Sequence, residues 1–492
     1  MGKVKFGWAE IDITPTEKIS LAGEFFERAT NKVETPITMT ALAIEADGEQ
    51  AVFCSCDLVG IRPDLIEETR RKLNAPGLDP NKIIMNAIHT HNSYTVGAKP
   101  GTTESRNALQ VLCGFLPEGC KYIPQVTSDD CLPPVKALDI LSDKAAAVIA
   151  EAWAKRAEGG YANGFGRAAV GMCRRVCYSD GHALMWGDAD RATFTQLEGG
   201  NDSGIEMIFT YDADKKLTGV VANVACPSQV CEQRSFISSD YWGKVKILLR
   251  EKYGKDLYVL GLCSAAGDQC PRDLVRWVEP ETPIDDPNVI RKNPKYRRAD
   301  PSMFDIKGSW TAGRRIVNEI DYAISEVTDI KTEAVFKHEA GKLSLPLRRV
   351  TDAEAAEAEK AIREFVKGRT EVNYVDTAMM HVYAGTLIRY EYQENHDDFQ
   401  FEVHNLRFGD VAISTNPFEL FLDYGNQIRA RTPAAQTILI QLCCGSGGYL
   451  PTAKAEEGGH YSAYVSSGRV GHVGGEIYVR ETLEAHRRLF KD

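Results

Sequence analysis

The sequence lacks the features that would place the protein in a membrane or on a nucleic acid. No run of apolar residues approaches the length of about eighteen that a membrane-spanning helix needs. An excess of positive charge is missing too, because 58 basic residues face 69 acidic ones, for a net charge of −11. Such a field repels phosphate backbones and anionic lipids. We therefore expect a small-molecule substrate, with no nucleic acid and no membrane as a partner.

A secretion signal and a pattern of paired cysteines are also missing. The first residues contain no basic and apolar leader, so we expect a cytoplasmic protein whose thiols stay reduced. The 13 cysteines are odd in number and irregularly spaced, which fits no disulfide framework. None of them forms a paired C-x-x-C zinc motif.

What the sequence does contain is the composition of a large folded protein. Its 492 residues are 43% hydrophobic, enough to bury a sizeable core. Short β-rich runs alternate with helical runs, without a repeat of fixed period. Strands are predicted at residues 39–46, 51–56, 82–88, 218–225, 256–263, 334–345, 411–415 and 437–442, and helices at 63–73, 142–155, 241–251, 351–367, 419–431 and 475–489. This pattern predicts an α/β fold with a mixed β-sheet core flanked by helices, in a single domain over residues 1–492.

Two long stretches, residues 92–134 and 271–305, show no regular pattern. Loops of that length inside a compact chain are usually functional covers or disordered insertions. Each stretch leaves the end of a predicted strand, where sites in α/β proteins tend to collect. We therefore predict that both are insertions that cover the active site.

The first candidate motif holds two histidines, His89 and His91, at the end of a predicted strand. Residues i and i+2 of an extended strand face the same side, so both imidazoles can point into one cavity. The spacing suits a metal site, or a general base beside a metal. A pair of hydrogen-bonded histidines at a strand end is the alternative.

The second motif is a turn of small residues that contains Asp268, Gln269 and Cys270. Small residues let the backbone approach a ligand closely. Cys270 is a candidate nucleophile, although a lone cysteine is more often an inert small hydrophobe.

The last two motifs contribute a carboxylate and a tyrosine. Glu419 stands between apolar residues after a strand, where it either meets a cation or caps a helix. The glycines around Tyr449 lack the lysine of a phosphate loop, so they would bring the Tyr449 backbone close to a site rather than bind a nucleotide. An ordinary glycine turn is the alternative.

Taken in order, these motifs resemble one family. The landmarks are residues 9–15 (AEIDITP), 21–23 (LAG), 56–60 (CDLVG), 89–91 (HTH), 239–241 (SDY), 267–271 (GDQCP), 417–419 (PFE) and 448–452 (GYLPT). The sequence resembles the N-terminal catalytic domain of the neutral/alkaline, non-lysosomal ceramidases and their bacterial relatives. The resemblance spans nearly the whole chain and implies the fold of that domain.

The resemblance also implies a metal centre. In the family one zinc ion is held by two histidines, a glutamate and a tyrosine, which here gives His89, Glu419 and Tyr449. His91 and Arg174 match residues that contact the substrate, and Tyr461 lies at the position of a second tyrosine. Nitrogen and oxygen ligands with an open position let zinc lower the pKa of its water to roughly 7.

One departure from the family pattern removes a metal ligand. Pro227 stands where relatives carry the second histidine. Gln229, Cys226 or His404 could fill the gap, and Gln229 is otherwise expected to contact the substrate. A set poorer in nitrogen would hold zinc less well and favour manganese or another harder ion, or the metal could have been lost. We expect one divalent metal ion, with zinc as the first choice.

A second departure concerns the substrate. Cys270 replaces a serine that the family uses near its site, and Arg272 replaces an asparagine. We expect Cys270 to be a catalytic residue and Arg272 to contact an anionic or polyhydroxylated substrate, which argues against ceramide. Asp240 and Asp268 either orient the ligands or stabilise turns.

Three functions remain open from the sequence. The first is a metal-dependent hydrolase that cleaves an amide, ester or glycoside-like bond of a small polar substrate, with His91 and Tyr461 stabilising the oxyanion or moving protons. The second is a metal-assisted lyase, hydratase or isomerase that acts on a sugar-derived molecule. The third is a non-catalytic binding protein on a decayed enzyme scaffold. The oligomeric state is open as well, including a homo-oligomer.

Overall fold

The body of the protein consists of three β-sheets. The computed structural model describes residues 1–25, 27–97, 107–123, 130–276 and 305–491. The first sheet has the order β7 (Ile83–Ala87), β6 (Glu49–Cys56), β5 (Thr38–Ala46), β2 (Lys5–Asp12) and β9 (Ala157–Glu158). The second has the order β10 (Gly160–Arg167), β15 (Gly204–Tyr211), β16 (Leu217–Val224) and β17 (Tyr258–Cys263). The third has the order β20 (Phe336–Pro346), β22 (Asp398–Phe408), β23 (Val411–Thr415) and β25 (Gln436–Ile440).

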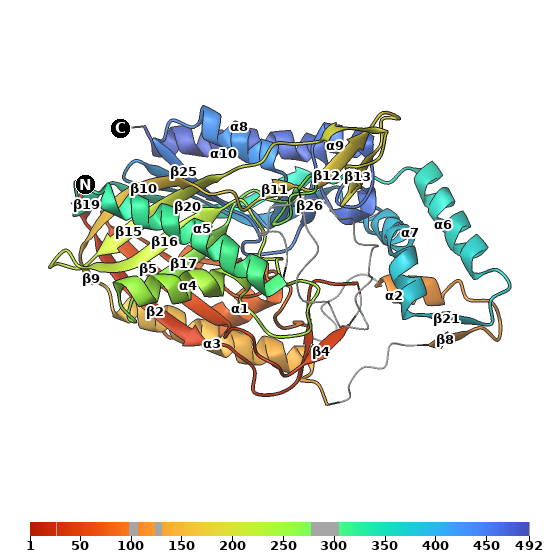
Figure 1. The fold of residues 1–492 in the computed structure, drawn as a ribbon, viewed down its shortest axis with the longest axis horizontal. Coiled ribbons are helices and arrows are strands. Elements are labelled where there is room, and N and C mark those ends of the chain that lie inside the picture. Colours follow the sequence, from red (N-terminus) through yellow and green to blue (C-terminus); the bar gives the residue numbers. More distant parts are fainter. Residues whose placement is uncertain (26, 98–106, 124–129, 277–304, 492) are drawn as a thin grey trace.

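A pair of helices covers the outer face of each sheet. The pairs are α1 (Pro63–Lys72) with α3 (Pro134–Ala154), α4 (Asp240–Tyr253) with α5 (Asp305–Ser325), and α8 (Leu422–Arg431) with α10 (His472–Leu489). In Figure 1, α1 and α3 lie along one side of the body and α8 and α10 along the opposite side, with α4 and α5 between them. The inner faces of the sheets are left to pack on one another.

All three sheets are built in the same order. Three strands form two antiparallel pairs, a helix crosses over to a fourth strand parallel to the third, and a second helix follows after a long connection. The sequence shows no repeat of fixed period because the connections differ in length. Each sheet therefore contains one pair of parallel strands, and the carboxyl ends of these pairs are where a binding site is expected.

The inner faces of the three sheets share one apolar core. Each sheet contributes large aliphatic or aromatic side chains that are buried there, and these pack on one another across the centre. They include Phe6, Leu42 and Phe53 from the first sheet, Ile208, Val221 and Leu260 from the second, and Ile413, Ile438 and Ile440 from the third. Burial of this surface from water is what holds the three sheets together.

A smaller unit projects from one end of the body. It contains α2 (Ala108–Cys113), β8 (Lys121–Ile123), α6 (Asp352–Val366), β21 (Glu371–Asn373) and α7 (Tyr374–Tyr392), and it has its own apolar cluster. The prediction that residues 92–134 contain no regular element is therefore wrong for the described residues. Apolar residues at helical spacing in α2 pack on α7 and favour this helix. Residues 277–304, most of the second predicted cover, lie outside the described residues.

The remaining elements are short. They are β1 (Gly2–Lys3), β3 (Ile19–Leu21), β4 (Arg28–Thr30), β11 (Met172–Cys173), β12 (Arg175–Tyr178), β13 (Ala183–Met185), β14 (Phe194–Leu197), β18 (Gln269–Cys270), β19 (Glu333–Ala334), β24 (Phe418–Leu420), β26 (Gly448–Leu450) and α9 (Ala453–Gly458). The mixed α/β architecture is confirmed, and every predicted strand coincides with an observed one. Three helices begin several residues away from the predicted start: α3 begins at Pro134, not at residue 142, α8 begins at Leu422, not at Glu419, and α10 begins at His472, not at residue 475.

Candidate active site

The predicted site residues lie beyond the carboxyl ends of the parallel strand pairs. The long connections after β7, β17 and β25 carry His89 and His91, Cys270 and Arg272, and Tyr449 and Tyr461 respectively. The shorter connections after β16 and β23 carry Gln229 and Glu419. Residues from all three sheets are thus brought to one end of the body, as expected for a site in an α/β fold.

His89 occupies a strained backbone conformation. The strand β7 ends at Ala87, and His89 has a φ of 68°, in the left-handed region that side chains other than glycine rarely adopt. Its N–H and that of Thr90 both donate to the Leu58 carbonyl, so the connection after β6 fixes the turn. The expectation that an extended strand turns His89 and His91 to the same side is wrong, because the strand has already ended, although their Nε2 atoms do lie 3.5 Å apart.

Glu419 and Tyr449 are held opposite each other by a two-stranded parallel ladder. Glu419 lies on β24 and Tyr449 on β26, and their Cα atoms are paired in register. Gly448 has a φ of 69°, which lets the glycine-rich turn enter β26 at this place. The helix-capping alternative for Glu419 is therefore wrong, and the glycine turn brings Tyr449 to Glu419 as expected.

Arg174 links these side chains. Its guanidinium donates to the Tyr449 hydroxyl at 3.2 Å and to the Gly267 carbonyl at 3.0 Å, and lies 3.7 Å from the Glu419 carboxylate. Burial alone would raise the pKa of Glu419, but His89 and Arg174 outweigh it and hold that pKa below its ordinary value. Glu419 is therefore an ionised carboxylate next to a fixed positive charge.

His91 faces two carboxyl groups that the sequence reading did not identify, Glu24 and Glu232. The His91 Nδ1 atom lies 3.5 Å from Glu24 Oε1 and 3.7 Å from Glu232 Oε2. Burial raises the pKa of Glu24 to about 7, against the opposing charge of Arg28. Burial, and then the neighbouring His89, lowers the pKa of His91 to about 3, so its imidazole is neutral. A carboxyl that titrates near neutrality beside a neutral imidazole can exchange a proton with a substrate.

The local structure explains why the Leu-Ala-Gly landmark ends in a glycine, Gly23. Gly23 has a φ of 98°, and a Cβ atom built there would lie 2.3 Å from Cγ of the His91 ring. Arg28, fully buried, donates to the carbonyls of Ala22 and His91 and so ties this turn to the site. Only glycine fits between the turn and the imidazole.

Aromatic rings form the outer edge of the site. The rings of Tyr449 and Tyr461 meet edge to face at 5.4 Å, and Tyr461 contacts Phe25 at 5.5 Å. Phe25, which is 50% exposed, reaches His381 on α7 at 5.1 Å. Burial raises the pKa of Tyr461 to about 12, so its hydroxyl stays a hydrogen-bond donor at neutral pH.

The donor atoms fit a divalent cation. His89 Nδ1 lies 2.6 Å from the Val59 carbonyl, which can only accept, so Nε2 is the atom that faces the site, and loss of its proton would free a lone pair for a metal, as in metal-ligating histidines. That Nε2 atom faces Glu419 Oε2 at 3.5 Å. Two donors on one tetrahedral ion with bonds of about 2 Å lie ~3.3 Å apart. His89, Glu419 and Tyr449 thus offer one nitrogen and two oxygens, a set that also suits ions harder than zinc.

The three residues considered for the missing ligand at Pro227 have other contacts. Gln229 lies 2.7 Å from His91 Nε2 and 3.4 Å from Arg174, and so bridges these two. The Cys226 thiol contacts the carbonyls of Val170 and Pro227, and burial raises its pKa well above the ordinary value. His404 belongs to a separate cluster with Glu402 and Cys444. Within the described part of the chain, none of the three contacts His89, Glu419 or Tyr449.

Cys270 and Arg272 lie in the second connection. Cys270, on β18, pairs with Met172 and is fully buried, and its thiol donates to the Arg272 carbonyl at 3.2 Å. Burial raises the pKa of Cys270 to about 12, which favours the inert alternative over a nucleophilic thiolate. The Arg272 guanidinium lies over the Trp186 ring at 4.8 Å, and burial lowers its pKa.

Asp240 and Asp268 stabilise turns. Asp240 accepts hydrogen bonds from the backbone N–H groups of Cys231 and Tyr241 at the start of α4. Asp268 accepts one from Leu422 at the start of α8, at 2.9 Å. In the described structure they hold backbone segments rather than the side chains of the predicted ligands.

Comparisons with known proteins identify the fold. No family model and no curated protein matches the sequence. The neutral ceramidase from Pseudomonas aeruginosa matches with a TM-score of 0.66 and 14% identity, over 100% of this chain and 76% of that chain. A ceramidase described as complexed with C2 matches with a TM-score of 0.63 and 12% identity, over 99% and 75% of the two chains. The protein therefore has the α/β fold of the neutral ceramidases.

Among the described residues, no helix combines the length and the apolar character that crossing a bilayer requires.

Proposed function

We propose that the protein is a metal-dependent hydrolase that cleaves an amide, ester or glycoside-like bond of a small polar substrate. The observation that carries the proposal is the approach of His89, Glu419 and Tyr449 to one another at the carboxyl ends of the strands. The fold shared with neutral ceramidases supports hydrolysis as the reaction class.

His89, Glu419 and Tyr449 would hold the ion, which supplies a Lewis acid and a more acidic water when bound. Zinc is the first choice and manganese the second, because two of the three donors are oxygens. The permanent charge of Arg174 keeps Glu419 ionised and ready to bind a cation.

The protein's own groups would bind the substrate and move protons. Arg174 is 2% exposed and already donates to two oxygens, which suits it to orient a carbonyl or hydroxyl of the substrate. Tyr461 would donate to the developing oxyanion. Glu24, through its proximity to His91, would supply or accept the proton of the leaving group.

The substrate class follows from the charge of the site. The buried Arg174 and the partly buried Arg272 favour an anionic or polyhydroxylated molecule over a neutral lipid. All 13 cysteines are unpaired and nine of them are buried, which supports our proposal of a reducing, cytoplasmic location. We propose no nucleic acid or membrane partner.

The test is elemental analysis of the full chain, followed by a screen of soluble amides, esters and glycosides with the metal-loaded form. We expect His89→Ala to lose one equivalent of metal relative to wild type and to lose turnover. His182→Ala is the matched control, because that side chain is 74% exposed and lies outside the site. Retention of metal and activity by His89→Ala would contradict the proposal. An empty site with ligand-induced thermal stabilisation but no turnover would instead identify a binding protein.

One observation favours a second reaction class. The Glu24 carboxyl, whose pKa burial raises to about 7, is a suitable base for removing a proton from carbon in a lyase, hydratase or isomerase. Mass spectrometry of the products separates the two reactions. Hydrolysis gives two products whose masses sum to that of the substrate plus one water, hydration gives a single product heavier by one water, and elimination and isomerisation add no water.

A further inference from the structure

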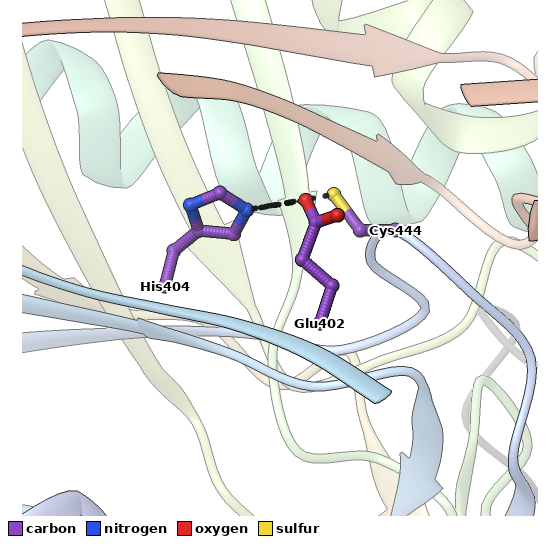
Figure 2. A group of neighbouring side chains, drawn as sticks. All are labelled: Glu402, His404 and Cys444. Carbon is purple, nitrogen blue, oxygen red and sulfur yellow. Dashed lines mark hydrogen bonds and ion pairs between the residues drawn. The ribbon is translucent and has the colours of Figure 1, made fainter. Parts of the chain in front are cut away.

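A second cluster of metal-ligating side chains lies between the first and third sheets. Its members are Glu402 and His404 on β22 and Cys444 in the connection after β25, and we call it the His404 cluster. One ligand atom from each residue lies within 4.8 Å of the other two. Figure 2 shows the three side chains pointing toward one another. The proposed reaction does not use them.

Outer contacts fix the orientation of the histidine. His338 Nδ1 lies 3.0 Å from the Gln50 carbonyl, which can only accept, so His338 Nε2 is left to accept from His404 Nδ1 at 2.9 Å. The His404 Nε2 atom therefore faces Glu402 Oε1, at 2.7 Å, and Cys444 Sγ, at 3.9 Å. A histidine whose other ring nitrogen is held in this way is the usual arrangement at metal centres.

The carboxylate and the thiol are fixed as well. Arg70 on α1 donates to both oxygens of Glu402, at 2.5 and 2.7 Å. Cys444 has a φ of 51°, an uncommon conformation for a side chain other than glycine, in the turn that directs its sulfur toward His404. Its Sγ atom lies 3.8 Å from that of Cys443. Two thiolates on one zinc ion with bonds of about 2.3 Å lie ~3.8 Å apart.

We propose that the His404 cluster is a structural site for a thiophilic divalent cation, with zinc as the natural occupant. Glu402, His404 and Cys444 are the ligands, and Cys443 is the nearest further donor. When the ion binds, it takes the place of the proton between His404 Nε2 and Glu402. Any thiol that becomes a ligand loses its proton as well, so protons are released to solvent. Because His404 is fully buried, the ion fastens β22 to the connection after β25 rather than meeting a substrate.

Cobalt distinguishes this site from the candidate active site, which offers no sulfur. The full chain is stripped of metal with a chelator and titrated with Co²⁺. We expect a thiolate-to-cobalt charge-transfer band in the near ultraviolet that saturates at one equivalent. Cys444→Ser should abolish the band, and Cys231→Ser, which removes a buried thiol elsewhere, should keep it. His89→Ala should keep it too.

The outer contact to His338 provides a graded test. His338→Phe removes the acceptor for His404 Nδ1 and should weaken metal binding by about 10–100-fold. His338→Gln can still accept a hydrogen bond and should restore most of the affinity. A purely structural effect of the substitution would lower thermal stability without changing the cobalt affinity, and that result would argue against the proposal.

A measurement on the wild-type chain covers the case in which Cys444→Ser does not fold. X-ray absorption at the zinc edge should show a sulfur neighbour at about 2.3 Å together with nitrogen or oxygen neighbours at about 2.0 Å. A zinc-loaded wild-type protein without a sulfur neighbour would overturn the proposal. So would a charge-transfer band that persists in Cys444→Ser, or a Cys443–Cys444 disulfide in protein that takes up no metal.

Discussion

The candidate active site and the His404 cluster contain similar side chains, but they differ in how many of their polar atoms have hydrogen-bond partners. Each has a histidine whose Nδ1 is hydrogen-bonded and a carboxylate beside an arginine. In the active site, however, His91 Nδ1 and Arg174 Nε are buried atoms that make no hydrogen bond within the described residues. The ring nitrogens of His404 and the carboxylate of Glu402 are all engaged.

This difference indicates which of the two centres is suited to react. Buried polar groups left without partners cost free energy and persist where a ligand completes them. The active site also borders the half-exposed Phe25, whereas the side chain of His404 is fully buried. Ligands that are closed off from solvent are typical of a structural metal site, and a set of ligands with an open edge is typical of a catalytic one.

The largest expected effect is the loss of the active-site carboxylate. Glu419→Gln removes the charge that faces His89 and Arg174, so both cation binding and substrate positioning are impaired. We expect kcat/KM on the best substrate to fall by about 1000-fold, in the range of losses for groups that act directly in catalysis. Steady-state kinetics of the metal-loaded protein measures the change.

The control for this variant is Glu339→Gln, which removes a carboxylate that is 41% exposed and pairs only at the surface with Arg488. We expect its kcat/KM to equal that of wild type. Equal activity of Glu419→Gln and wild type would contradict the assignment of the two centres, because the candidate active site would then not be the reacting one. Cobalt binding at the His404 cluster should be the same in both variants.

An element of the fold could be predicted from the sequence where neighbouring residues determine it, and could not be predicted where distant segments do. The strand at residues 411–415 is a short apolar run and coincides with β23. The helix α7 was missed because its apolar residues lie on all sides rather than on one face. Glu419 was assigned to a helix because nothing local shows that Phe418–Leu420 pairs with a strand about thirty residues later.

The residues of the two centres also divide into those that stand in a short sequence motif and those that only the fold brings together. His89, Glu419 and Tyr449 stand in recognisable short motifs, and the structure brings them together. Glu24 and Glu232 belong to no motif, and they meet His91 only because the chain folds three distant segments onto one another. His404 was considered from the sequence only as a ligand of the other centre, because no motif joins it to Cys444, which lies 40 residues later in the chain.

A buried histidine outside both centres provides a reference for the effect of burial alone. His486 on α10 is hydrogen-bonded to Ser414 and Thr432, and burial lowers its pKa to about 4. Its pKa is about 6.5 in the unfolded chain. The contribution to stability is therefore fully present above pH 6.5 and is lost as the pH falls from 6.5 to 4, to a total of about 3 kcal/mol.

We expect His486→Gln to flatten this pH dependence, so that the variant loses less stability than wild type between pH 7 and pH 5. Urea unfolding at the two pH values, on metal-free protein, gives the free energies of unfolding. This result provides a reference for the two centres, because a pH dependence that appears only in the metal-loaded protein then belongs to metal binding. Identical curves for variant and wild type would show that His486 is not the buried neutral group described here.

The smallest expected effect comes from changing Gly23, in the turn that packs against the His91 ring of the active site. Gly23→Ala and Gly48→Ala both place a side chain at positive φ, 98° and 79°, which costs about 1–2 kcal/mol. The new Cβ at position 23 would also meet the His91 ring at 2.3 Å, whereas nothing lies within 4 Å of the one at position 48.

We therefore expect both variants to lose stability from backbone strain, with a larger loss for Gly23→Ala. Only Gly23→Ala should also reduce kcat/KM, because it displaces His91 from Glu24 and Gln229. Thermal unfolding and steady-state kinetics of the pair separate strain from displacement. Equal losses of thermal stability and of kcat/KM in the two variants would mean that the approach of the turn to His91 does not matter for the reaction. The active site would then differ from the His404 cluster less than its geometry indicates.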